Sequence, residues 1–211
     1  MMHSPGSYTV ILDSSVLVPG FLSNFLLWMA DADLFRVKWT DDIHQEWMRG
    51  RRERYGHAQA VLDARRKVMD EGFPDSLVTD YDSLVDGLSL PDKDDRHVLA
   101  AAIKCGANAI VTSNLRHFPA HLLAPFNLAA ISQDDFVLDQ IYLTTGTPQI
   151  VATAIIRHKK SLSKTRTTWR QYFDTMGKPG VGLQKTHAEL MRTEFRTLIG
   201  ELLRTGDWKK E

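Results

Sequence analysis

The residues best suited to chemistry are acids and an amide at the ends of predicted secondary-structure elements. Asp13 directly follows an apolar run at residues 10–12, and Asn114 follows another at residues 109–112. Because ligands bind outside the carboxyl ends of the strands in an open parallel sheet, both residues are candidates for one shared site. For Asp13 the alternative is a purely structural role as the cap of the next helix.

Further candidate acids lie on predicted helices. Glu46 follows Ile43 by three residues on a predicted helix at residues 42–54, which places it on the core-facing side. The alternatives for this acid are a rim position or pairing with Arg49 or the neighbours of Arg49. Three more acids crowd the start of an alanine-rich helix, where the helix dipole alone would favour them: Asp92, Asp94 and Asp95.

Gathered at one edge of a sheet, these side chains would form a cage of oxygen atoms. Carboxylate and amide oxygens are the ligands that Mg²⁺ and Mn²⁺ prefer. The small side chains of Ala100, Ala101 and Ala102 would let their helix lie close to the sheet, near the strand ends. The eight histidines do not combine with the single cysteine, Cys105, in a Cys/His ligand pattern, which argues against a structural zinc site.

Short apolar runs alternate with helical patterns over the first two thirds of the chain. Strands are predicted at residues 8–13, 35–40, 77–79, 109–112 and 128–132, and helices at 21–32, 42–54, 57–71, 94–104 and 120–124. This alternation predicts an α/β fold, with a parallel sheet of about five strands flanked by helices. Later segments are predicted to be helical only: 132–142, 147–158, 169–176 and 184–203. We therefore predict a domain at residues 1–143 and a helical C-terminal extension at 144–211.

Charge is distributed unevenly along the chain. Residues 1–143 hold 13 Lys and Arg against 20 Asp and Glu, whereas residues 144–211 hold 13 against 6. A basic extension could dock on the acidic part, offer a surface to an anionic partner, or simply be solvated. The single cysteine, Cys105, and the lack of a signal-peptide pattern predict a cytoplasmic protein, and no apolar run reaches the roughly 20 residues of a membrane span.

Four segments resemble, in order, the motifs of PIN domains, particularly those of bacterial VapC-type toxins: VILDSSVL, DDIHQEWMRG, PDKDDRHVLAAAIKCGANAIVTSN and LRHFP. The resemblance covers residues 8–143. It implies that Asp13, Glu46 and Asp95 are the three catalytic acids and that Asn114 is the fourth site residue. Asp92 remains an alternative or an auxiliary to Asp95. The resemblance also implies that Asp13 and Asp95 bind Mg²⁺ or Mn²⁺.

As a function, the resemblance implies a metal-dependent endoribonuclease that is the toxin of a type II toxin–antitoxin system. Transfer or ribosomal RNA would be the substrate and a cognate antitoxin protein the partner, and a homodimer is left open. The alternative is a noncatalytic PIN-like module that binds RNA or a protein, because Asn114 in place of an acid removes one charge from the cage.

Other residues allow both a functional and a structural interpretation. His97 could contact a phosphate or could serve in packing. An arginine-rich patch after Glu46 could hold RNA phosphates or be a solvated helix face: Arg49, Arg51, Arg52 and Arg54. A second group could stack on unpaired bases or form a core stripe: Trp169, Arg170, Tyr172 and Phe173.

Overall fold

The computed structural model describes residues 8–142, 147–162 and 167–205. These residues divide into two compact units. The sheet unit comprises Tyr8–Pro19 and Arg36–Ser132. The helical unit comprises Gly20–Phe35 and the described residues of Gln133–Glu211.

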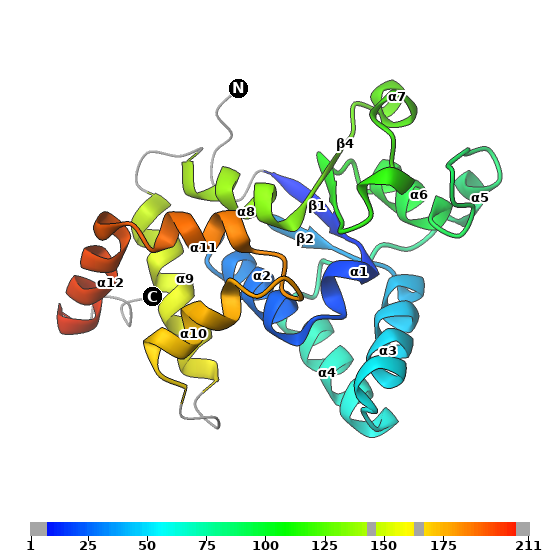
Figure 1. Ribbon diagram of the computed structural model, residues 1–211. Coiled ribbons are helices and arrows are strands. Elements are labelled where there is room, and N and C mark those ends of the chain that lie inside the picture. The colour runs from blue at the N-terminus through cyan, green and yellow to red at the C-terminus, as the bar shows by residue number, and fades with distance from the viewer. Residues whose placement is uncertain (1–7, 143–146, 163–166, 206–211) are drawn as a thin grey trace. The chain divides into compact units, whose positions relative to one another are not determined.

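The sheet unit is built on four parallel strands in the order β2-β1-β3-β4. Strands β1, β2 and β4 of this sheet are labelled in Figure 1. The strands are β1 (Thr9–Leu12), β2 (Arg36–Lys38), β3 (Ala109–Val111) and β4 (Ala129–Ile131). Val10, Ile11 and Leu12 in the central strand β1 are completely buried, as expected for a parallel strand without a solvated face. The parallel sheet predicted from the sequence is confirmed.

The prediction of a fifth strand at residues 77–79 is wrong. Leu77 forms only an isolated bridge with Trp39, just after β2. Two backbone hydrogen bonds frame this bridge, from Trp39 N to Ser76 O and from Val78 N to Trp39 O. Asp80 then adopts a left-handed conformation with φ of 58°, which turns the chain away before a ladder can extend.

Helices and tight turns of the sheet unit contain Glu46 and begin next to Asp13, Asp95 and Asn114. They are α1 (Ser14–Leu17), α3 (Asp41–Tyr55), α4 (Gln59–Gly72), α5 (Asp82–Val85), α6 (Arg96–Lys104), α7 (Ala120–Leu123) and the 3₁₀ turns η1 (Leu115–His117) and η2 (Ala124–Phe126). Helix α6 contacts β1 and β3, and its residues Ala100–Ala102 are completely buried. The alanines therefore permit the close approach that the sequence predicted.

Helix α3, which carries Glu46, has well-defined ends and a close neighbour. The Thr40 hydroxyl accepts a hydrogen bond from Ile43 N at 3.1 Å, and Gly56, whose φ is 67°, caps the C-terminal end of the helix. A methyl group at Gly50 would lie 2.8 Å from Cγ2 of Val18, next to the end of α1. The glycine thus allows α3 to pack tightly against α1.

The helical unit contains α2 (Gly20–Asp31), α8 (Gln133–Tyr142), α9 (Thr147–Ser161), α10 (Trp169–Met176), α11 (Gln184–Leu190) and α12 (Thr193–Thr205). The prediction of one helix at residues 184–203 is wrong. Arg192 N bonds to Glu189 O, three residues back, and this tighter turn ends α11 before α12 begins. Helix α9 contacts α2, α8 and α12 within this unit.

A buried histidine and a buried aspartate connect helices within the helical unit. His158 on α9 is completely buried, and its Nδ1 lies 2.9 Å from the hydroxyl of Tyr172 on α10. The ring centroids of Phe21 and Phe25 on α2 lie 4.8 and 5.7 Å from the centroid of the His158 imidazole. Asp134 on α8 accepts hydrogen bonds from two amides in the first turn of α11, Lys185 N and Thr186 N, both at 2.8 Å.

The boundary predicted between residues 143 and 144 lies outside the described residues, so the division into a domain and an extension stays a prediction. None of the helices in the described ranges is both long and apolar enough to cross a membrane.

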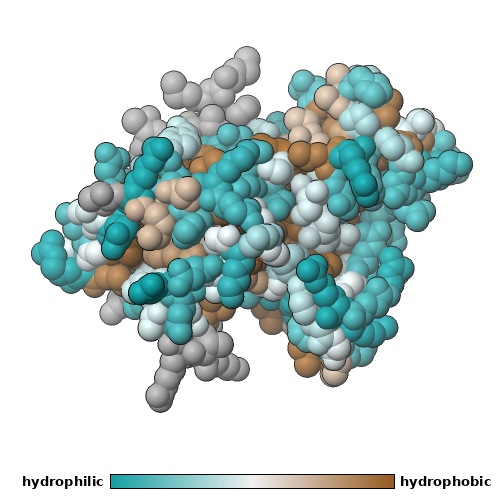
Figure 2. Space-filling model, in the orientation of Figure 1, coloured by the Kyte–Doolittle hydropathy of each residue, from teal (hydrophilic) through white to brown (hydrophobic). Residues whose placement is uncertain are grey.

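Hydrophilic side chains predominate on the visible surface over α3 and α4 (Figure 2).

Candidate active site at the carboxyl edge of the sheet

Asp13 lies at the carboxyl end of β1 with only 2% of its surface exposed. Its Oδ2 accepts hydrogen bonds from the Ser15 and Thr112 hydroxyls, each at 2.6 Å. Although Asp13 precedes α1, its carboxylate makes no capping hydrogen bond to that helix. The structural alternative of a helix cap therefore does not account for this side chain, which is held across the ends of β1 and β3.

Hydrogen bonds also join the end of β3 to the end of β1. Thr112 is completely buried, and its hydroxyl also accepts a hydrogen bond from Asn114 N at 2.9 Å. Ser113 N donates to the Ser15 hydroxyl at 3.0 Å, which ties the two strand ends together. The backbone of Asn114 is thus fixed at the same edge as Asp13, as the sequence predicted, and its side chain is half-buried.

Asp95 stands at the start of α6 without making a side-chain capping hydrogen bond. Its Oδ2 lies 2.7 Å from Nδ1 of His117 in η1. Burial raises the pKa of Asp95; the hydrogen bond from His117 opposes this, and the charges of Asp13 and Asp92 add to the rise. Asp95 therefore lies within electrostatic range of Asp13.

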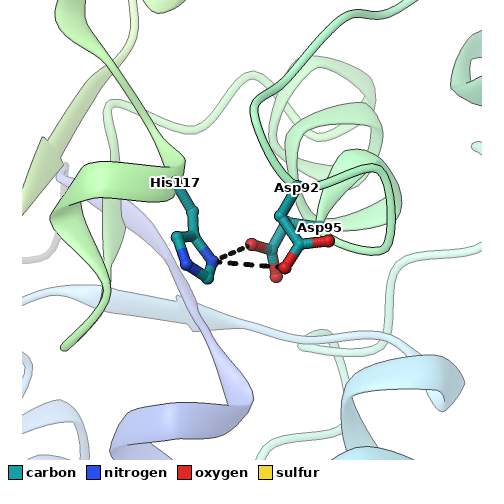
Figure 3. Close-up of side chains that lie close together, drawn as sticks. All are labelled: Asp92, Asp95 and His117. Atoms are coloured by element: carbon teal, nitrogen blue, oxygen red, sulfur yellow. Dashed lines mark hydrogen bonds and ion pairs between the residues drawn. The ribbon is translucent and has the colours of Figure 1, made fainter.

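The three acids before α6 differ in their exposure and in their contacts. Asp94 is exposed, and its backbone N–H donates to Oδ1 of Asp92 at 3.0 Å. The other oxygen of Asp92 lies 3.6 Å from Nδ1 of His117, so Asp92 and Asp95 approach the imidazole together (Figure 3). Both remain candidates for the third acid of the site.

Glu46 is held by a histidine on a different helix. Its Oε1 lies 2.8 Å from Nε2 of His97 on α6, and the Glu46 side chain is 26% exposed. Burial lowers the pKa of His97, but the hydrogen bond and charge of Glu46, together with the charges of Asp42 and Asp13, outweigh it and raise the pKa. Glu46 is thus paired with His97, and this contact replaces the pairing with Arg49 considered from the sequence.

One group of possible ligands is tighter than the predicted cage. Among the described residues, the ligand atoms of Asp92, Asp95 and His117 all lie within 4.8 Å of one another. Asp13 and Glu46 lie outside this group. The charge of Asp13 acts on Asp95, a member of this group. Glu46 contacts His97, which lies two residues after Asp95.

Sequence reasoning gave no site role to His117, Thr112 or Ser15. His117 belongs to the LRHFP segment that carried part of the resemblance, which was the available signal. The packing role considered for His97 left out its contact with Glu46. The contact of Thr112 with Asp13 depends on the pairing of β1 with β3. The local sequence does not specify that pairing.

The predicted arginine patch is dispersed in the structure. Arg51 is buried and donates from its guanidinium to Leu17 O at 2.9 Å, which makes it structural. Arg52 pairs with Gln59, and the Arg54 guanidinium lies 5.6 Å from the centre of the Tyr55 ring. Arg49 is exposed.

Comparison with known proteins identifies the family of the chain. No solved structure matches the chain. A curated protein of Mycobacterium tuberculosis (strain ATCC 25618 / H37Rv), "Putative ribonuclease VapC50", is 43% identical over 72 residues, which are 34% of this chain and 42% of that protein. The family model described as PIN domain matches residues 9–116, just over half of the chain and all the candidate residues above except His117. The protein therefore belongs to the PIN domain family.

Proposed function

We propose that this protein is a metal-dependent endoribonuclease of the VapC type and the toxin of a type II toxin–antitoxin system. Membership of the PIN domain family supports a nuclease, and the similarity to a protein named as a ribonuclease supports RNA as the substrate. The observation that carries the proposal is the placement of Asp13 at the end of β1 within electrostatic range of Asp95 at the start of α6.

The donor set at this edge fits a divalent cation. Two carboxylates that interact unfavourably without a counter-charge gain most from a cation placed between them. Asp13 and Asp95 would hold Mg²⁺ or Mn²⁺ through carboxylate oxygens, the ligands that these ions prefer. Such an ion supplies charge neutralisation at the scissile phosphate and makes water a better nucleophile.

The remaining residues would orient the reactants. Glu46 would accept the proton of the attacking water, and His97 would fix the direction of its carboxylate. Asn114, fixed through its backbone to Thr112, would offer an amide oxygen to the ion or to a water beside it. If water attacks phosphorus and the bond from phosphorus to the 3′-oxygen breaks, the 3′-oxygen leaves as a hydroxyl and the other product carries a 5′-phosphate.

Partners follow from the same chemistry. Transfer or ribosomal RNA is the proposed substrate, in a cytoplasmic setting. An antitoxin could block the carboxylates with an arginine, since a guanidinium pairs well with carboxylate oxygens. A homodimer stays open.

The test is to express the protein in a bacterial cell and to sequence the RNA ends that carry a 5′-phosphate. We expect new ends at a small number of sites in transfer or ribosomal RNA, and none with Asp13→Asn. If the protein binds RNA and neither version produces new ends, the noncatalytic module is the correct interpretation.

A further inference from the structure

His117 is a nitrogen donor placed beside Asp95, an acid of the proposed metal site, and beside Asp92, the alternative to Asp95. Its Nδ1 lies 2.7 Å from Oδ2 of Asp95 and 3.6 Å from Oδ2 of Asp92 (Figure 3). The side chains are partly open, with exposed fractions of 20% for His117, 18% for Asp95 and 43% for Asp92. We call these three residues the His117 cluster.

The backbone around the cluster is fixed on both sides. The turn η1 is closed by a hydrogen bond from His117 N to Asn114 O at 2.9 Å, and the next residue, Phe118, is 2% exposed. On the other side, the bond from Asp94 N occupies Oδ1 of Asp92 and leaves Oδ2 directed at the imidazole. The three ligand atoms therefore converge without rearrangement of the chain.

A hydrogen bond between His117 and Asp95 could account for one of these contacts, but two acids compete for the same nitrogen. A single proton on Nδ1 can serve one short contact, and Asp92 remains at 3.6 Å. A cation with two positive charges would satisfy both carboxylates and use the nitrogen lone pair.

We propose that His117 Nδ1 is a metal ligand and that the His117 cluster selects a first-row transition-metal ion over Mg²⁺. Imidazole nitrogen favours Mn²⁺, Co²⁺ or Zn²⁺ relative to Mg²⁺, which prefers oxygen ligands and gives up its waters reluctantly. The inference rests on the proposed metal-dependent function and specifies the ion that the site would take.

Binding would require a proton to move within the ring. Nε2 of His117 lies 3.2 Å from Nε of Arg116, which donates to it, so the ring proton resides on Nδ1. Ligation through Nδ1 transfers that proton to Nε2 by way of solvent and breaks the bond from Arg116. Arg116 is exposed and can turn to water, so Arg116→Gln should not weaken metal binding.

The experiment uses the full chain, Mn²⁺ and Mg²⁺ as probes, and the variants His117→Asn and His97→Gln. Calorimetric titration gives both affinities, and pulsed electron paramagnetic resonance detects nitrogen bound to Mn²⁺. In the unaltered protein we expect Mn²⁺ to bind more tightly than Mg²⁺ and to show nitrogen coupling. His117→Asn should lose the coupling and at least about tenfold in Mn²⁺ affinity, with Mg²⁺ affinity nearly unchanged. His97→Gln, which removes the neighbouring histidine, should retain the coupling.

Several results would overturn the inference. Equal binding of Mg²⁺ and Mn²⁺ would exclude the proposed selection of the ion. Mn²⁺ binding without nitrogen coupling, or coupling that survives His117→Asn, would exclude His117 as a ligand. Each of these results would leave a metal-dependent nuclease intact. Binding of neither ion would instead remove the metal from the proposed function as well. Circular dichroism of each variant ensures that a lost signal does not come from unfolding.

Discussion

Nε2 of His97 on α6 lies 2.8 Å from Oε1 of Glu46 on α3. This contact connects the helix that begins after Asp95 to the acid proposed to act on water. His97 Nδ1, the other ring nitrogen, is buried and has no hydrogen-bond partner among the described residues. The imidazole is therefore directed at Glu46, and its role is to position that carboxylate.

His97→Ala should lower kcat for RNA cleavage by about 10- to 100-fold with little change in KM, because the Glu46 carboxylate loses its orientation. His97→Gln should restore part of the rate, since its amide can donate to the same oxygen. Single-turnover cleavage with excess enzyme separates this effect from binding. An unchanged rate for His97→Ala would exclude the positioning role.

Asp95→Asn should abolish cleavage while leaving the melting temperature without metal equal or higher. A raised carboxyl pKa means that the folded protein binds the Asp95 proton more tightly than the unfolded chain does. Asp95 therefore favours folding at pH values below its ordinary pKa, and this contribution is lost as the pH rises through the raised value. At neutral pH the ionised Asp95 carboxylate lowers the free energy of unfolding, and the neutral amide of Asp95→Asn removes this destabilisation.

Thermal unfolding of Asp95→Asn and the unaltered protein at pH 7, with and without Mn²⁺, checks this prediction. Mn²⁺ should raise the melting temperature of the unaltered protein, because a ligand that binds only the folded state stabilises it. A strongly destabilised Asp95→Asn protein that still cleaves RNA would contradict the metal-binding role of Asp95.

Acid should destabilise the helical unit through His158. Burial lowers the pKa of this histidine to about 3, whereas an unfolded histidine has a pKa of about 6.5. Between these values the unfolded chain binds a proton that the folded chain excludes. Stability should therefore be complete above about pH 6.5 and fall by up to about 1.4 kcal/mol for each pH unit below it. Denaturant unfolding at pH 7 and pH 5 should show a smaller difference in His158→Gln.

Removing residues 144–211 should cause aggregation. Helix α9 covers α2, so its loss would expose the rings of Phe21 and Phe25 that lie against His158. Two basic residues of this region already have local partners: the Arg157 guanidinium lies 3.7 Å from Asp31, and Lys159 lies 5.3 Å from the centre of the Trp169 ring. Size-exclusion chromatography tests the structural role.

The matched control is Arg170→Glu in the full chain, because Arg170 is exposed on α10. If residues 144–211 recruit RNA, this reversal should weaken RNA binding and reduce its salt dependence, as removal of a phosphate contact does. We expect no such change. A soluble truncated protein with unchanged RNA affinity would reject both the structural and the recruiting role.

The sequence could predict residues whose position follows from chain direction alone. Asp13 and Asn114 follow strands that are parallel neighbours, so both must reach the carboxyl edge of the sheet. The strand predicted at 77–79 failed because the left-handed turn at Asp80 prevents a ladder, and aspartate carries no unique signal for that conformation.

Contacts between distant elements could not be predicted in this way. The partner of Glu46 depends on how α6 lies relative to α3, and that of Asp95 on where η1 turns after β3. His117 therefore had no role assigned from the sequence, and His97 was considered only for a phosphate contact or for packing. Ser15 and Thr112 were likewise visible as polar residues, but their shared contact with Asp13 arises only when the strands pair.

Cleavage of RNA by the purified protein tests the central claim most directly. The measurement is the amount and end chemistry of the fragments formed with Mn²⁺, with EDTA, and by Asp13→Asn with Mn²⁺. The account predicts fragments with a 5′-phosphate and a 3′-hydroxyl in the first case only, since both the cation and the Asp13 carboxylate are required. Fragments that persist in EDTA or with Asp13→Asn, or that end in a cyclic phosphate, would contradict it.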